Sequence, residues 1–180
     1  MHFDPNRLLT LRALAMDVDG VLTDGTLTWS PTGEEFKTFS FADIMGISLL
    51  RRLGFKLALI SGEASPQVDL YARKMHIPFV AKGIRDKASA LRAFSEKFTI
   101  PLEQIAYFGD DINDLAAMEL AGLCACPSNA ADEVASFAYT HSGFVSTARG
   151  GQGAIRSLAD AILAARNQRG RDIFLLQPPE

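Results

Sequence analysis

The sequence has little of several features that mark whole classes of protein. Only two of its 180 residues are cysteine, too few for the disulfide framework of a small secreted domain. The formal net charge of −3 at pH 7 gives no electrostatic reason to expect nucleic acid or an anionic membrane as a partner. No apolar run approaches the roughly 20 residues that span a bilayer, and the N-terminus lacks the layout of a secretion signal. We therefore expect a cytoplasmic protein that binds neither nucleic acid nor membrane.

The two cysteines, Cys124 and Cys126, alternate in a short apolar stretch that ends at Pro127. Their spacing is not that of a CxxC pair, and no third or fourth metal ligand lies near them in the sequence. A metal or redox pair remains the alternative. We expect two buried free thiols on a strand.

Apolar runs of strand length alternate with helical patterns along the chain, and 48% of the residues are hydrophobic. This alternation is typical of βαβ units. It predicts an α/β fold, a three-layer Rossmann-like parallel sheet that forms a single domain over residues 1–180. The expected strands are 13–18, 56–61, 78–81, 104–109 and 123–125, and the expected helices are 44–53, 66–75, 87–98, 113–120 and 153–168.

Residues 26–40 depart from this pattern and predict a β-hairpin inserted after the first strand, around a turn at Pro31 and Gly33. Its aromatic residues are more apolar surface than a two-stranded ribbon can bury alone, so pairing with hairpins of other subunits is one interpretation. The other is that they fold back on their own core. The polar segment 167–180 is expected to be a mobile tail. The aromatic residues concerned are Trp29, Phe36, Phe39 and Phe41.

Asp17 and Asp19 stand where the first apolar run gives way to Gly20. In an open α/β sheet this carboxyl end of a strand is where ligands bind. Two close carboxylates repel one another unless a cation or a proton lies between them. The pair therefore suggests a divalent metal, an acid/base partnership, or both.

Polar residues also follow the other predicted strands, and the same sheet edge would collect them. Carboxylates with one hydroxyl and one ammonium suit phosphoryl transfer, in which an aspartate attacks phosphorus, Mg²⁺ neutralises charge, and the lysine and hydroxyl hold phosphate oxygens. Taken singly, each has a local explanation, such as a turn, a helix start or a solvated lysine. The residues are Ser61 with Gly62, Lys87, and the group Asp110, Asp111, Asn113 and Asp114.

Together these motifs resemble the haloacid dehalogenase-type phosphatase superfamily, in order and over nearly the whole chain. The resemblance implies that Asp17 is the nucleophile and that Asp19 is the general acid and then the base. Both gaps in which such enzymes carry a cap domain are short here, so we expect no cap. The open site then calls for a large substrate or for a lid from another subunit. The resemblance further implies phosphate binding by Ser61, Gly62 and Lys87, Mg²⁺ binding by Asp17, Asp110 and the Asp19 backbone carbonyl, and supporting roles for Asp111, Asp114 and Asn113.

Residues 17–25, 41–46, 109–111 and 149–153 are similar to one capless branch, the phosphatases of 3-deoxy-2-keto sugar acids. That branch implies a homotetramer in which the hairpins form an intersubunit barrel and close the neighbour's site. Arg149 could grip a sugar carboxylate or could be a solvated loop cation. By the same resemblance, the candidate substrate or interface residues are Thr23, Asp24, Asp43 and Arg149.

After Ser61 and Gly62 the branch members that act on octulosonate 8-phosphate typically place an arginine, whereas this chain has Glu63, followed by Lys74. The Glu63 and Lys74 combination slightly favours a nonulosonate 9-phosphate, a sialic acid precursor, with the octulosonate nearly level. Alternatives are another sugar phosphate, a nucleotide, or a non-catalytic assembly module. The complete set of carboxylates argues against the last of these.

Overall fold

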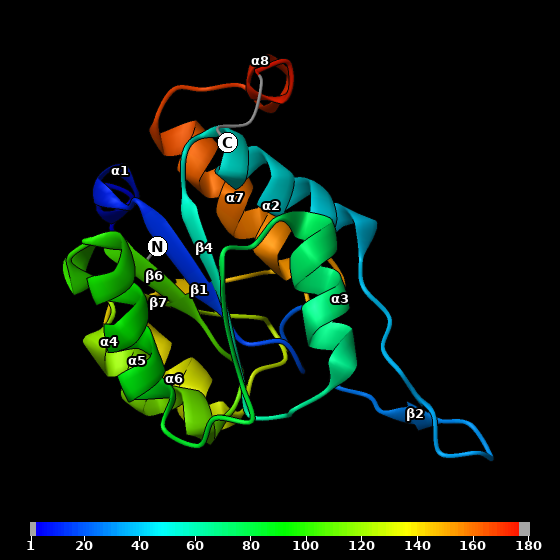
Figure 1. Ribbon diagram of the computed structural model, residues 1–180. Coiled ribbons are helices and arrows are strands. Elements are labelled where there is room, and N and C mark those ends of the chain that lie inside the picture. The colour runs from blue at the N-terminus through cyan, green and yellow to red at the C-terminus, as the bar shows by residue number, and fades with distance from the viewer. Residues whose placement is uncertain (1–2, 177–180) are drawn as a thin grey trace.

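A six-stranded parallel sheet forms the centre of the protein, whose computed structural model describes residues 3–176. Its strand order is β5-β4-β1-β6-β7-β8, and every neighbouring pair is parallel. This confirms the α/β fold expected from the sequence. Figure 1 labels the central strands β4, β1, β6 and β7. The strands are β1 (Ala13–Met16), β4 (Lys56–Ser61), β5 (Phe79–Lys82), β6 (Ile105–Phe108), β7 (Leu123–Cys126) and β8 (Phe144–Val145).

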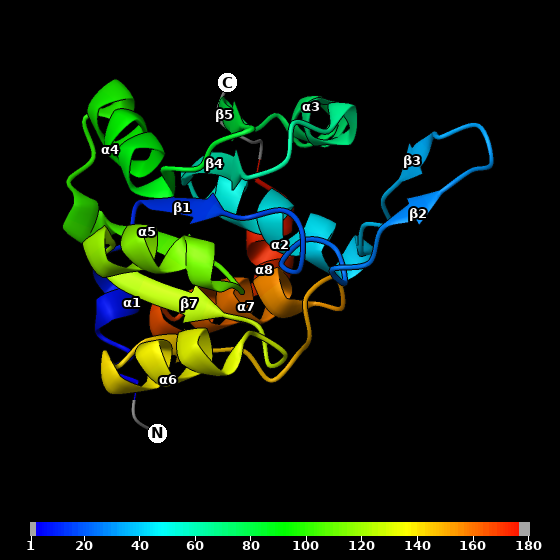
Figure 2. The same cartoon turned by 90° about the horizontal axis from the view of Figure 1, so that it is seen from below.

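Helices cover both faces of this sheet (Figures 1 and 2). On one face lie α2 (Phe41–Arg52), α3 (Pro66–Met75) and α7 (Ala154–Ala165), and on the other lie α4 (Lys87–Phe98), α5 (Leu115–Leu120) and α6 (Asp132–Thr140). No described helix is long and apolar enough to cross a membrane. The short elements are α1 (Arg7–Thr10), α8 (Gly170–Phe174) and the 3-10 helices η1 (Leu102–Gln104) and η2 (Ile112–Asp114).

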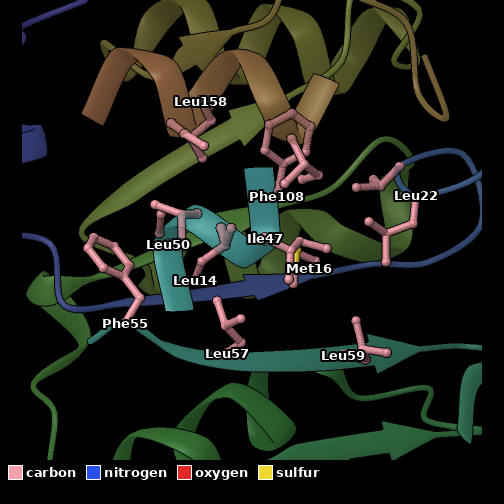
Figure 3. Close-up of a cluster of buried hydrophobic side chains, with 14 of the residues drawn as sticks. Leu14, Met16, Leu22, Ile47, Leu50, Phe55, Leu57, Leu59, Phe108 and Leu158 are labelled. Atoms are coloured by element: carbon pink, nitrogen blue, oxygen red, sulfur yellow. The ribbon is translucent and has the colours of Figure 1, made fainter. Parts of the chain in front are cut away.

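The two faces of β1 enter two different cores, because alternate side chains of a strand point to opposite faces. Leu14 and Met16 pack with Leu57 and Leu59 of β4 beneath α2 and α7 (Figure 3). The small side chains of Ala13 and Ala15 lie in the second core, toward α4, α5 and α6. A strand buried on both faces reads as a continuous apolar run, which is why the sequence pattern located it.

The inserted hairpin is present, with short antiparallel strands β2 (Thr28–Trp29) and β3 (Glu35–Phe36), and it projects from the body (Figures 1 and 2). Trp29 is 66% exposed and Phe36 is 54% exposed. Phe39 instead packs back on its own domain, where its ring stacks on Tyr71 with centroids 4.2 Å apart. Phe39 therefore folds back on its own domain, whereas the pairing of Trp29 and Phe36 with hairpins of other subunits stays a prediction.

Several element boundaries differ from those predicted. Helix α2 begins at Phe41 and not at residue 44, because the Ser40 side chain accepts a hydrogen bond from the Ala42 N–H and caps the helix there. A 3-10 turn occupies residues 112–114 before α5. The sequence pattern did not find α1, α6, β8 or α8, which are short elements.

Helix α8 lies in the segment that was expected to be a mobile tail. Its Ile173 is buried and forms a small cluster with Leu49 and Leu163. Residues 177–180 lie outside the described residues, and the mobility of the segment stays a prediction. Cys124 and Cys126 are buried free thiols on β7, as expected.

Candidate active site

The carboxyl ends of three adjacent strands converge at one edge of the sheet. Met16, the last residue of β1, is in register with Leu59 of β4 and with Phe108 of β6. The next backbone N–H, that of Asp17, donates to the Phe108 carbonyl at 2.9 Å. The polar residues that follow these strands are thus delivered to a common place.

A cavity of about 260 Å³ opens at this edge. Loops after β1, β4 and β6 all contribute to it, so groups more than 90 residues apart in the chain face the same space. Asp17 is 5% exposed and Ser61 is 1% exposed. The cavity is lined by Asp17, Asp19, Gly25, Ser61, Gly62, Glu63, Asp110, Asp111 and Asn113.

Lys87, the first residue of α4, is buried between two carboxylates of this site. Its Nζ lies 3.0 Å from Asp17 Oδ2 and 2.7 Å from Asp114 Oδ1. Burial lowers the pKa of Lys87, but the attraction of Asp17 and Asp114 outweighs burial and raises the pKa overall. The ammonium is therefore a fixed positive charge beside Asp17, as a phosphate-binding site needs.

Asp114 is fully buried, and both of its carboxylate oxygens accept hydrogen bonds. Oδ1 accepts from Lys87 Nζ and, at 2.8 Å, from the Tyr107 hydroxyl, while Oδ2 accepts from the Asp110 N–H at 3.0 Å and the Asp111 N–H at 3.3 Å. Asp114 thus orients Lys87 and the Asp110 loop through hydrogen bonds. The sequence reasoning missed Tyr107, because a tyrosine inside an apolar strand gives no sign of a site.

Asp17 and Asp110 carry oxygens that suit a divalent cation. One oxygen each of Asp17, Asp110 and Asp114 lie within 4.8 Å of one another. Asp17 Oδ1 and Asp110 Oδ1 are buried with no hydrogen-bond partner among the described residues. Clustered carboxylate oxygens are the hard ligands that Mg²⁺ prefers, and the unused oxygens fit such an ion.

Without a cation, these two carboxyl groups hold protons at unusually high pH. Burial, reinforced by Asp114, raises the pKa of Asp17 to about 7 against the lowering effect of Lys87. Burial, reinforced by Asp17 and Asp114, raises the pKa of Asp110 to about 8. A cation in place of these protons would relieve the repulsion between the carboxylates.

Glycines bring the backbone close to the carboxylates. Gly20 has φ +85°, and a Cβ there would lie 1.9 Å from Asp110 Oδ2. A Cβ on Gly150 would lie 1.7 Å from the Gly20 carbonyl oxygen, and the Gly151 N–H donates to the Val21 carbonyl at 2.9 Å. The glycine-rich segment at 149–153 therefore supports the loop that carries Asp19.

Asp19 lines the cavity and forms an ion pair with Lys37, which comes from the hairpin. The Lys37 side chain is only 2% exposed. Burial lowers the pKa of Lys37, but its pairing with Asp19 and Glu35 raises it overall. Nothing in the sequence singled out Lys37, because a lysine on a hairpin ordinarily faces solvent.

Two predicted substrate or interface residues, Thr23 and Asp43, are buried and hydrogen-bonded to the backbone. The Asp43 side chain is fully buried and accepts hydrogen bonds from the N–H groups of Gly153 and Arg156, each at 3.0 Å, at the start of α7. The Thr23 hydroxyl is buried and accepts from the Gly20 N–H at 3.2 Å and the Gly25 N–H at 3.3 Å. These contacts give both residues a structural role, and their roles toward a substrate or a neighbouring subunit stay predictions.

The remaining predicted substrate residues divide between the cavity and the surface. Glu63 lines the cavity. Lys74 does not, and its Nζ lies 5.9 Å from the centroid of the Phe41 ring. Asp24 and Arg149 are exposed and outside the lining; Asp24 Oδ1 accepts from the Thr26 N–H at 2.9 Å.

Comparison with known proteins identifies the family. Residues 62–147 match the haloacid dehalogenase-like hydrolases. The 3-deoxy-D-manno-octulosonate 8-phosphate phosphatase KdsC of Escherichia coli strain K12 is 32% identical over 158 residues, which are 88% of this chain and 82% of KdsC. The chain belongs to the haloacid dehalogenase-like hydrolases. The resemblance seen in the sequence is thereby confirmed, and this hydrolase is an enzyme of the phosphatase type.

Solved structures agree with this assignment to the haloacid dehalogenase-like hydrolases. The 3-deoxy-D-manno-octulosonate 8-phosphate phosphatase of Yersinia pestis has a TM-score of 0.88 at 29% identity, covering 97% of this chain and 90% of that chain. The corresponding phosphatase of Moraxella catarrhalis, in complex with a magnesium ion, a phosphate ion and a KDO molecule, has a TM-score of 0.86 at 34% identity and covers 95% of both chains.

Proposed function

We propose that this haloacid dehalogenase-like hydrolase removes the phosphate from a phosphorylated 3-deoxy-2-keto sugar acid, with octulosonate 8-phosphate as the first candidate. One observation carries the chemistry: two acidic groups, Asp17 and Asp19, share a cavity with Ser61, and the buried Lys87 ammonium contacts the first of them. This is the arrangement that an aspartyl-phosphate route needs.

In this route Asp17 attacks phosphorus, and the bond to the sugar oxygen breaks as the bond to the Asp17 carboxylate forms. Asp19 gives its proton to the departing sugar alkoxide and then takes a proton from the water that releases phosphate. The Ser61 hydroxyl and Lys87 would hold phosphate oxygens, with the Gly62 backbone leaving room beside them. Lys87, which is held by Asp114, contacts Asp17 and keeps its carboxylate in one orientation.

Asp17, Asp110 and the Asp19 backbone carbonyl would hold Mg²⁺. When bound, the ion supplies positive charge that offsets repulsion between the attacking carboxylate and the phosphate. The unpartnered oxygens of Asp17 and Asp110 support this assignment. Asp111, Asp114 and Asn113 are proposed to support the metal and phosphate positions from the η2 side.

The relatives named above act, by name, on the octulosonate 8-phosphate, which supports that substrate. The slight preference for a nonulosonate 9-phosphate rested on Glu63 and Lys74 together. Glu63 lines the cavity and can accept hydrogen bonds from sugar hydroxyls, but Lys74 lies beside Phe41. The nonulosonate is therefore the second candidate, and Arg149 and Asp24 are kept as residues that could meet a substrate or a neighbouring subunit.

A substrate comparison tests this proposal. We expect Mg²⁺-dependent phosphate release from octulosonate 8-phosphate with kcat/KM at least about tenfold above that for nonulosonate 9-phosphate, hexose 6-phosphates and a nucleoside monophosphate, since one well-matched polar contact is worth about that factor. A higher kcat/KM for the nonulosonate would exchange the two candidates. Preference for a hexose phosphate or nucleotide would contradict the sugar-acid assignment.

We also propose that the hairpins assemble a homotetramer that closes the open site. Trp29 and Phe36 are exposed on opposite faces of the hairpin, and Phe41 is 80% exposed; such exposed apolar side chains favour burial between subunits. Phe36→Asp places a charge on one of these faces. We expect the variant to elute as a monomer in size-exclusion chromatography with light scattering.

The matched control for this assembly experiment is Tyr139→Asp, at an exposed position on α6 far from the hairpin. It is expected to keep the oligomeric state of the unaltered protein. A tetramer that persists in Phe36→Asp would show that Phe36 of the hairpin is not part of the assembly surface.

A further inference from the structure

We propose that Lys37 is a positioning residue for the general acid, fixing one oxygen of Asp19 so that the other faces the leaving group. The inference rests on the proposed function, because it concerns the proton that Asp19 delivers. It assigns a role in the reaction to the inserted hairpin of the same subunit, in addition to any part the hairpin has in assembly.

The two oxygens of Asp19 have different surroundings. Oδ1 accepts from the Lys37 ammonium, whereas Oδ2 is buried without a hydrogen-bond partner among the described residues. Asp19 itself lines the cavity. A hydrogen bond to one oxygen of a carboxyl group restricts rotation of the side chain. The other oxygen therefore keeps one direction. Oδ2 is then the atom that carries and returns the proton.

Lys37 is held in place by Glu35 of the hairpin, which is bound in turn by residues outside the hairpin. Its Nζ lies 3.4 Å from Glu35 Oε1, which also accepts from the Ser65 hydroxyl at 2.8 Å. The Gln67 side-chain amide donates to the Glu35 carbonyl. Ser65 and Gln67 stand at the start of α3, just after the Ser61 loop. The hairpin is therefore attached to the catalytic edge by polar contacts, and Lys37 extends from that attachment to Asp19.

The burial of the Lys37 side chain shows that it is not an ordinary solvated surface lysine. The neighbouring Phe36 is 54% exposed, but the Lys37 side chain is 2% exposed and lies against Asp19. A buried ammonium is costly unless it is paired with good geometry. The hairpin could be anchored by Glu35 and Ser65 alone. Anchoring of the hairpin therefore does not explain why Lys37 also pairs with Asp19, and a role in the active site does.

The reaction step affected is the breaking of the ester bond. As Asp17 bonds to phosphorus, the leaving oxygen takes the proton of Asp19, which becomes a carboxylate. A nitrophenolate leaves without needing this proton, whereas a phenolate or sugar alkoxide needs it increasingly. A residue that positions the acid must therefore matter more for poor leaving groups. A residue that only stabilises the fold would affect every substrate alike.

The experiment compares Lys37→Met with the unaltered enzyme on p-nitrophenyl phosphate, phenyl phosphate and octulosonate 8-phosphate, using kcat/KM because it covers binding and ester cleavage but not later hydrolysis. We expect a loss of about tenfold or more for the two poor leaving groups and less than about threefold for p-nitrophenyl phosphate, since acid catalysis contributes about 10²-fold or more. Lys37→Arg should recover most of the loss. Equal losses on all three esters, or no loss, would overturn the proposal.

A double-variant cycle separates action through Asp19 from any independent role. In an Asp19→Asn background, Lys37→Met should cost less than about twofold further on phenyl phosphate, because effects of residues that act as a unit are not additive. If the loss from Lys37→Met is as large in the Asp19→Asn background as in the unaltered enzyme, the proposal is contradicted. Lys82→Met, which removes the lysine of the partly exposed Lys82–Asp69 pair, is the control and should leave kcat/KM unchanged.

Failure of the proposed function gives a different result. If the unaltered enzyme hydrolyses the aryl phosphates but not octulosonate 8-phosphate, the proposed substrate is wrong, and the two aryl esters still decide the role of Lys37. If it hydrolyses none of the three with Mg²⁺, the phosphatase route is wrong, and the inference about Lys37 falls with it.

Discussion

Asp17→Asn is expected to lose all measurable turnover, a fall of about 10⁴-fold or more, as removal of a covalent nucleophile does in other hydrolases. The amide is a poor nucleophile and a weak ligand for a divalent cation. It is nearly the same size as the carboxyl group, so packing at this buried site is kept. Phosphate release from p-nitrophenyl phosphate with Mg²⁺ is the measurement.

Asp160→Asn is the matched control for this loss. Asp160 lies on α7, pairs with Arg156 and is 52% exposed, far from the cavity lining. It should keep the turnover of the unaltered enzyme. Circular dichroism should show that Asp17→Asn is folded. Residual activity in Asp17→Asn within tenfold of the unaltered enzyme would mean that another group attacks phosphorus.

Lys87→Met is expected to reduce stability as well as activity. Lys87 is 1% exposed and holds the buried carboxylates of Asp17 and Asp114 together. Removing one partner of a buried ion pair leaves uncompensated charge and costs about 3–5 kcal/mol. For a chain of this size that corresponds to a fall in Tm of about 10 °C, which thermal denaturation in metal-free buffer would show. Phosphate release should fall too, because the phosphate loses its ammonium.

The stability loss in Lys87→Met should grow with pH. In the unaltered, metal-free protein the pKa of Asp17 is raised to about 7, so its carboxyl group is largely protonated at pH 6 and ionised at pH 8. A raised carboxyl pKa means that stability present at low pH declines as the pH rises through 7. Lys87 offsets this decline by attracting the ionised form. The difference in Tm between variant and unaltered protein is therefore expected to be larger at pH 8 than at pH 6.

Lys82→Met serves as the comparison for a lysine removed from a partly exposed pair, where a cost of about 0–1 kcal/mol is usual. A Lys87→Met protein as stable as Lys82→Met, or a Tm difference that shrinks as pH rises, would contradict the buried-pair account. Metal-free conditions matter because a cation at Asp17 and Asp110 would displace the protons that produce the pH dependence.

Local sequence pattern was sufficient for five of the six parallel strands and for most of the residues that line the cavity. The buried strands β1 and β4 are continuous apolar runs, and the chemistry-bearing residues follow directly at their ends, so chain order alone implied where they would meet. Asp17 and Asp110 are at this edge because they come after a strand, and Ser61 is there because it ends one. Short elements such as β8 and α1 have too few residues for a period to be detected.

The amino-acid sequence by itself determined the α/β layering, the order of the catalytic segments and the family, because those depend on periodicity and on residues that stand next to strand ends. Only the tertiary structure decided that Lys37 meets Asp19, that Tyr107 and Asp114 brace Lys87, and that Asp43 caps α7. Such contacts join residues from separate segments, and the sequence does not show which of these residues meet. Their partners are set by how the hairpin and helices dock, which no local pattern encodes.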